Sequence, residues 1–158
     1  MKKFIATLAT IVVALGSAFA QDLAAVTELY NSGAEAISTD KAGALKSFEA
    51  ALSLADALGA EGQEIVANCK NIIPNLRLSL AKDLVKASQF DEAIAALQEL
   101  EKVAEAYEAL DVLNEATTLI PQVKMSKANN LYKAKEYDAA AAAFQEILDA
   151  EPTNGNAA

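Results

Sequence analysis

Apolar residues recur at helical spacing along most of the chain, in paired segments that flank a short break. The segment before one such break places its apolar residues on one face of a helix: Leu78, Ala81, Leu84 and Val85. The segment after the break repeats the arrangement: Ala93, Ala96, Leu97 and Leu100. Because the break at residues 88–90 is short, the two helices must run antiparallel. The pattern therefore predicts a helix–turn–helix unit.

This unit recurs with a period of 47 residues. Residues 73–100 align with residues 120–147 without a gap, and 13 of the 28 aligned pairs are identical, too many for shared composition to explain. A fixed period of this size is typical of stacked helical repeats, in which each unit buries its apolar face against its neighbours. The alternative is an unrelated helical bundle, which the internal repeat disfavours.

Equivalent residues mark the helices of each unit. Pro74 and Pro121 fall inside or at the start of a long helix. A proline there removes one hydrogen bond, so we expect a shared kink or break that sets the shape of the unit. Asp91 and Asp138 fall where the second helix begins, and we expect their carboxylates to satisfy free amides and the positive helix end. Residues 59–62 are expected to form a helix C-cap and turn.

Small and large apolar residues alternate within each unit in a way that resembles the tetratricopeptide repeat (TPR) family. The third unit matches the family pattern at Ala128, Leu131, Ala140, Phe144, Ile147 and Pro152. The second unit matches at Ala81, Leu84, Ala93, Leu97 and Leu100. The first unit, one residue shorter in its turn, matches at Gly33, Ala36, Ala44, Phe48 and Ala51. Small residues are needed where the two helices cross closely, and the aromatic residue fills the gap beside them.

The resemblance implies an all-α fold, a right-handed α-solenoid of about three helix–turn–helix repeats. We expect units at about 22–58, 61–108 and 111–152, within a TPR-like domain of residues 21–158. The family period is about 34 residues, so the excess of about 13 residues falls in segments 54–73 and 101–120, which are helical in pattern. We therefore expect a longer second helix running into a longer first helix of the next unit, as in long-repeat members of the family.

Residues 1–20 have the parts of a signal peptide. Lys2 and Lys3 are positive, residues 4–15 are apolar, and residues 17–20 supply the small side chains that a signal peptidase reads. The apolar run is too short to span a bilayer, which takes roughly 20 residues. We therefore expect cleavage after Ala20, a bacterial origin, and a periplasmic or secreted mature protein with no integral membrane segment.

Composition and charge exclude several classes of function. The chain has no histidine and one cysteine, which excludes histidine-based triads, imidazole metal sites, thiolate clusters and intrachain disulfides. The formal net charge of −9 becomes −11 without Lys2 and Lys3, and no dense basic patch offsets it, so neither nucleic acid nor anionic lipid is an expected partner.

No catalytic site is expected either. The carboxylates of residues 99–111 are spread along helices with lysines among them, as on a solvated face. Cys69 lies in an apolar segment and is expected to be buried and inert, the alternative being a disulfide between chains. We therefore expect a protein that is not an enzyme and that needs no metal or cofactor.

The resemblance also implies a peptide-binding groove lined by the first helices of the units. Carried over by position, the groove residues of the second unit are Asn75, Leu78, Lys82, Val85 and Lys86. Those of the third unit are Gln122, Met125, Asn129, Tyr132 and Lys133, and those of the first are Thr27, Tyr30, Ala34, Ile37 and Ser38. Lysine and asparagine are suited to hold a carboxylate or an extended backbone, while methionine and tyrosine add apolar contact. The alternative is an ordinary mixed surface.

Some members of the family clamp the terminal carboxylate of a peptide with one lysine and one asparagine. Asn129 matches the asparagine, but Met125 stands where the lysine would be, so this specificity is not expected here. The leading hypothesis is an exported, non-enzymatic scaffold that binds another protein or a peptide. The alternative is a structural or self-assembly repeat segment of a larger envelope protein.

The last predicted helix, over residues 138–150, carries more apolar positions than one side of a helix can bury. These positions are Ala141, Ala142, Phe144, Ile147 and Leu148. The last unit of a repeat array leaves apolar surface uncovered unless another helix closes it. We therefore expect the chain to be part of a longer repeat protein, or to cover this edge by pairing with another chain.

Overall fold

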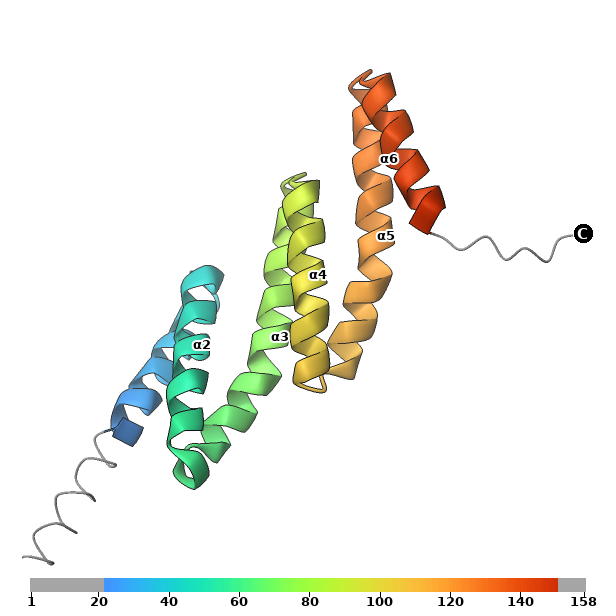
Figure 1. The fold of residues 1–158 in the computed structure, drawn as a ribbon. Helices are drawn as coiled ribbons and strands as arrows, with labels where there is room; N and C mark the ends of the chain where they lie inside the picture. Colours follow the sequence, from blue (N-terminus) through green and yellow to red (C-terminus); the bar gives the residue numbers. More distant parts are fainter. Residues whose placement is uncertain (1–21, 151–158) are drawn as a thin grey trace, which may run out of the picture. The chain divides into compact units, whose positions relative to one another are not determined.

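The computed structural model describes residues 22–150, and these residues form helices joined by short turns, without a strand. The predicted signal peptide and Pro152 lie outside the described residues. The first helix covers residues 22–36, and the elements that follow are α2 (Lys41–Ala57), the 3₁₀ turn η1 (Gly59–Glu61), α3 (Gln63–Lys86), α4 (Phe90–Ala106), α5 (Leu110–Lys133) and α6 (Tyr137–Ala150) (Figure 1). The all-α prediction is therefore confirmed.

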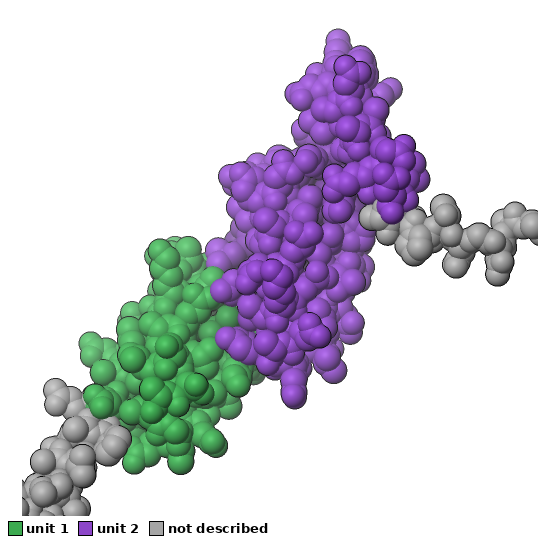
Figure 2. All heavy atoms as spheres, in the orientation of Figure 1, with its two compact units in different colours: residues 1–76 green, residues 77–158 purple. Residues whose placement is uncertain are grey.

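The chain divides into two compact units, one up to Leu76 and one from Arg77 onward (Figure 2). The boundary falls inside α3, two residues after Pro74. In the first unit the buried core is apolar: Val26, Ala44, Phe48, Ala51, Ala55, Cys69, Ile73 and Leu76.

The crossing of the first two helices shows why a small residue is needed there. A Cβ atom added to Gly33 would lie 3.1 Å from the Phe48 ring, which is closer than ordinary van der Waals contact. Phe48 is fully buried, and its ring meets that of Tyr30 edge to face at 5.3 Å. The predicted pairing of a small residue with an aromatic one is therefore present in the first unit.

The second unit has a core of the same design. Its fully buried small residues are alanines, which let the helices approach closely: Ala81, Ala93, Ala104, Ala116 and Ala128. Leu97 and Leu100 of α4 fill the space beside them, and α4 packs against α5, which in turn packs against α6. Ala140 and Ile147 of α6 are buried in the last of these contacts.

The 47-residue period is exact in the helices. α3 and α5 have 24 residues each and begin and end 47 residues apart, while α4 and α6 begin 47 residues apart. The excess length lies chiefly in α3 and α5, because α2 and α4 have 17 residues. Pro74 and Pro121 lie inside α3 and α5 rather than at their starts, and both helices continue through them.

The turns after α3, α4 and α5 share one backbone motif. After α3, Ser88 takes a left-handed φ of 59°, its N–H donates to the Val85 carbonyl, and the Gln89 N–H donates to the Leu84 carbonyl. Glu108 and Lys135 repeat this φ and both hydrogen bonds in their turns. This is the Schellman arrangement that closes a helix C-terminus, formed here without glycine.

The starts of the second helices agree with the prediction in position, but α4 differs in how its first amides are satisfied. Asp91 and Asp138 lie in the first turns of α4 and α6, where their charge favours the positive helix end. The N-cap of α4, however, is Gln89, and it makes no capping hydrogen bond with its side chain. Asp91 points its carboxylate at Lys127 of α5 instead. At the start of α2, Asp40 does cap the helix, since it accepts a 2.9 Å hydrogen bond from the Gly43 amide.

Candidate functional site

The predicted groove residues of α3 are only partly available to a ligand. Leu78 is 5% exposed and belongs to the core that α3, α4 and α5 form together, and Val85 is half-buried against the same core. The prediction that Leu78 lines a groove is therefore wrong, because its side chain is used in packing. Asn75 and Lys86 are exposed.

Lys82 and Lys86 of α3 both have carboxylate partners. Lys82 Nζ lies 2.5 Å from Glu115 Oε1 of α5, and Lys86 Nζ lies 3.1 Å from Asp83 Oδ1 one turn earlier. The contact between Lys82 and Glu115 shows that the first half of α5 lies against this face of α3. Both pairs are on the surface, where such an ion pair contributes about 0–1 kcal/mol.

The corresponding face of α5 is open. Its five predicted groove residues, which we call the α5 stripe, are all exposed: Gln122, Met125, Asn129, Tyr132 and Lys133. Met125 is 41% exposed and Tyr132 is 60% exposed. The structure therefore brings these residues together on one accessible helix face, with apolar groups, amides and one cation in a row.

Tyr137 extends the α5 stripe onto α6. The rings of Tyr132 and Tyr137 meet edge to face at 5.6 Å, and Tyr137 is 57% exposed. Tyr137 was not among the groove residues predicted from the sequence. Phe90, which lies one period earlier, is half-buried against the core of the second unit, so the repeat predicts a core residue at this position rather than an exposed one.

The opposite side of α5 is occupied by its neighbours. Lys127 Nζ lies 2.5 Å from Asp91 Oδ1 of α4, and Lys124 Nζ lies 3.2 Å from Glu146 Oε1 of α6. These two pairs border a cavity of about 140 Å³ among α4, α5 and α6. Because both lysines already have carboxylate partners, this cavity does not present a free positive charge to a ligand.

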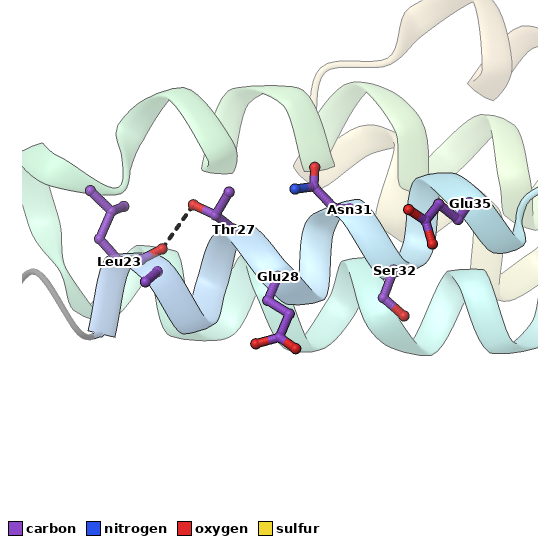
Figure 3. A pocket seen from close by; sticks show the side chains of 7 residues that line it. Leu23, Thr27, Glu28, Asn31, Ser32 and Glu35 are labelled. Carbon is purple, nitrogen blue, oxygen red and sulfur yellow. Dashed lines mark hydrogen bonds between the residues drawn. The ribbon is translucent and has the colours of Figure 1, made fainter.

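A larger hollow in the first unit lies on a single helix (Figure 3). Its described lining residues all come from residues 22–36: Leu23, Ala24, Thr27, Glu28, Asn31, Ser32 and Glu35. Thr27 Oγ1 donates a 2.8 Å hydrogen bond to the Leu23 carbonyl of its own helix. Thr27 and Ser38, predicted for the groove, are exposed, whereas Tyr30 packs on Phe48 and Ile37 is half-buried.

The cysteine thiol and the potential metal ligands are the reactive groups to consider among the described residues. Cys69 is fully buried in α3, and this burial raises the pKa of its thiol to about 11, so the thiolate is scarce at neutral pH. Within residues 22–150, no three carboxylate or thiolate side chains lie close enough together to hold a metal ion. None of the described helices is long and apolar enough to cross a membrane.

Comparisons of the chain with protein-family models, with curated proteins and with solved structures found no match.

Proposed function

We propose that this protein is an exported, non-enzymatic scaffold that binds another protein or a peptide along the α5 stripe. One observation carries this proposal. Met125 and Tyr132 are large, exposed and spaced along one face of α5, and Asn129 and Lys133 stand beside them. Tyrosine and methionine supply contact area, and the amide and ammonium groups can hold the backbone or the carboxylates of a bound peptide.

The proposed architecture is a TPR-like, right-handed solenoid of about three units. Its support is the burial of the small residues that the family pattern requires at the helix crossings. Ala81 and Ala93 in one hairpin, and Ala128 and Ala140 in the next, are at most 2% exposed. The large residue beside them is fully buried in α4, as Leu97, and half-buried in α6, as Phe144.

The proposed location is the periplasm or the extracellular medium. Its support is the sequence of residues 1–20, with two lysines, an apolar run and small residues before Gln21. The alternative function, a structural or self-assembly role, is favoured by one observation, the 62% exposure of Leu148 on α6.

Capture of partners from an envelope extract tests the binding role. The immobilised chain of residues 21–158 is compared with its Tyr132→Ser variant, which removes the aromatic group from the α5 stripe. The matched control is Leu54→Ser, which removes an apolar side chain 48% exposed in the first unit. We expect Tyr132→Ser to lose the captured protein and Leu54→Ser to retain it. Equal capture by the unchanged chain and both variants would show that the binding site lies outside the α5 stripe. Recovery of the immobilised chain alone would favour self-assembly.

A further inference from the structure

Cleavage after Ala20 would make Gln21 the first residue of the mature chain. Residues 17–20 supply the small side chains that a signal peptidase reads, and Gln21 follows them directly. A glutamine at the start of a chain carries a free α-amine and a side-chain amide that are one ring closure apart. The new terminus therefore combines a nucleophile and an electrophile in a single residue.

The structure describes the residues that follow Gln21. Residues 22–36 are helical, and Asp22, Ala24 and Ala25 are exposed. Val26, which is 2% exposed, is the first of the described residues whose side chain is buried in the core. In the mature chain, residues 22–25 therefore form a helical turn that lies ahead of the first core contact.

The hydrogen bond that braces this turn stays within the same helix. Thr27 Oγ1 donates to the Leu23 carbonyl at 2.8 Å (Figure 3). A bond of this kind supports the helix but does not tie its end to a neighbouring helix. Helix ends with few buried contacts open most easily, and proteolysis concentrates at such termini. The first turn is therefore accessible to enzymes that act on the end of a chain.

The charges at this end favour a neutral terminus. The N-terminal end of a helix carries a partial positive charge, which favours an anion and disfavours a cation. Asp22 supplies the anion, since it is exposed at the first described position. An ammonium group on the preceding residue would be the cation, and its attraction to an exposed carboxylate contributes little. Ring closure removes this cation and leaves the carboxylate of Asp22 in place.

We infer that Gln21 of the exported protein is converted to pyroglutamate. An α-amine is partly unprotonated near neutral pH, and its nitrogen attacks Cδ of its own side-chain amide. A bond forms between this nitrogen and Cδ, and the bond between Cδ and Nε2 breaks. The attacking amine passes one proton to the leaving nitrogen, which departs as ammonia, so no oxidant or other reactant is consumed. The inference rests on the proposed location, because cleavage after Ala20 is what frees this amine.

The mass of the mature protein tests the inference. A bacterium expresses residues 1–158, and the protein purified from its periplasm should have the mass of residues 21–158 less one molecule of ammonia. Reductive methylation of the intact protein labels free α-amines and should leave residue 21 unlabelled. Gln21→Ala is the matched control, because it keeps the small residues of the cleavage site but has no side-chain amide. This variant should show no loss of ammonia and should carry the label.

Trypsin locates the lost ammonia. The first lysine or arginine after Gln21 is Lys41, so a single peptide of residues 21–41 contains the terminus. Asn154 precedes Gly155, and an asparagine in that place can also lose ammonia. Fragment masses of the first and last peptides distinguish these two sources. Because methylation precedes digestion, it also distinguishes a ring present in the protein from one formed during the digestion.

Digestion from the N-terminus tests the consequence of the ring. An aminopeptidase needs a free α-amine, so it should leave the unchanged protein intact. It should shorten Gln21→Ala as far as about Val26, whose buried side chain holds the helix. A pyroglutamyl peptidase, which removes the cyclised residue, should make the unchanged protein as sensitive as the variant.

The possible failures are distinguishable by mass. The full mass of residues 21–158 with a methylated Gln21 would overturn the inference and leave the proposed location in place. A protein that keeps residues 1–20, or that begins at another residue, would overturn both. Loss of ammonia confined to the peptide with Asn154, or equal trimming of the unchanged protein and Gln21→Ala, would also overturn the inference.

Discussion

At the scale of single residues, the fold depends on small side chains at the positions where two helices cross closely. Gly33 lies against Phe48, where an added Cβ atom would be 3.1 Å from the ring, and Ala93 and Ala140 occupy the same kind of crossing in the later hairpins. The volume of these residues, more than any polar contact, sets how closely the helices approach.

Enlarging these residues should therefore destabilise the protein. We expect Ala93→Leu and Ala140→Leu to lower the free energy of unfolding by roughly 1–3 kcal/mol, as over-packing does in close-packed cores. Lys102→Leu is the matched control, because Lys102 is exposed and its ion pair with Glu99, one turn away on the same helix, lies on the surface. It should change stability by no more than about 0.5 kcal/mol. Urea melts measure all three variants, and coincident midpoints would contradict the repeat register.

Cys69 makes stability depend on pH in the alkaline range. Burial raises the pKa of its thiol to about 11, so the folded protein keeps this proton at pH values where the unfolded chain has lost it. Because the folded state then binds more protons, this contribution is complete below pH 9 and decreases between pH 9 and 11. Urea melts across this range should show a shallower loss of stability in Cys69→Ala than in the unchanged chain. Parallel pH profiles would show that Cys69 ionises equally in both states.

Sequence reasoning succeeded where the cause is local and periodic. The small residues at the crossings were identified from the resemblance to the TPR pattern, whose positions recur at the spacing of helix contacts. The predictions of an exposed Leu78 and of a capping role for Asp91 failed, because α5 packs near both residues. The partner of Asp91 is Lys127, which is 36 residues away in the sequence. The accessibility of the α5 stripe likewise depends on which helices pack beside α5, and no pattern within that helix contains this information.

At the scale of elements, three similar turns end α3, α4 and α5. A Schellman turn usually has glycine at the left-handed position, but here that position is occupied by Ser88, Glu108 and Lys135. The left-handed conformation costs an ordinary residue roughly 1–2 kcal/mol, which the packing of the hairpins offsets.

Glycine at these positions should therefore stabilise the hairpins. We expect Ser88→Gly and Lys135→Gly to raise the free energy of unfolding by about 0.5–1 kcal/mol each, after the added flexibility of the unfolded chain is subtracted. Ala87→Gly, one residue before the turn position, is the control and should be neutral or destabilising. Thermal melts compare the variants, and a destabilised Ser88→Gly protein would indicate that the serine side chain contributes more than its backbone costs.

At the scale of the whole molecule, the chain is acidic, and two of its exposed lysines stand at equivalent places. The formal net charge is −9, and Lys86 and Lys133 stand at equivalent ends of α3 and α5, both exposed. An acidic stretch of a partner would be attracted to these two positions and repelled from most others.

Reversing both charges should affect binding more than folding. We expect Lys86→Glu with Lys133→Glu to leave the melting midpoint nearly unchanged, because exposed ion pairs such as that of Lys86 with Asp83 contribute little. Capture of a partner from the envelope extract should weaken, most strongly at low salt, where charges are least screened. Undiminished capture at every salt concentration would place the recognised charges elsewhere.

No polar or charged residue is buried in the core of the described residues, and buried alanines recur one period apart at the helix crossings, Ala81 with Ala128 and Ala93 with Ala140. Such a core carries no unique pair of groups that must find each other, so one hairpin can in principle be exchanged for the next. A gene that lost or gained one block of 47 codons would still encode helices whose faces match their new neighbours. The number of hairpins is therefore a property that recombination can alter in whole steps.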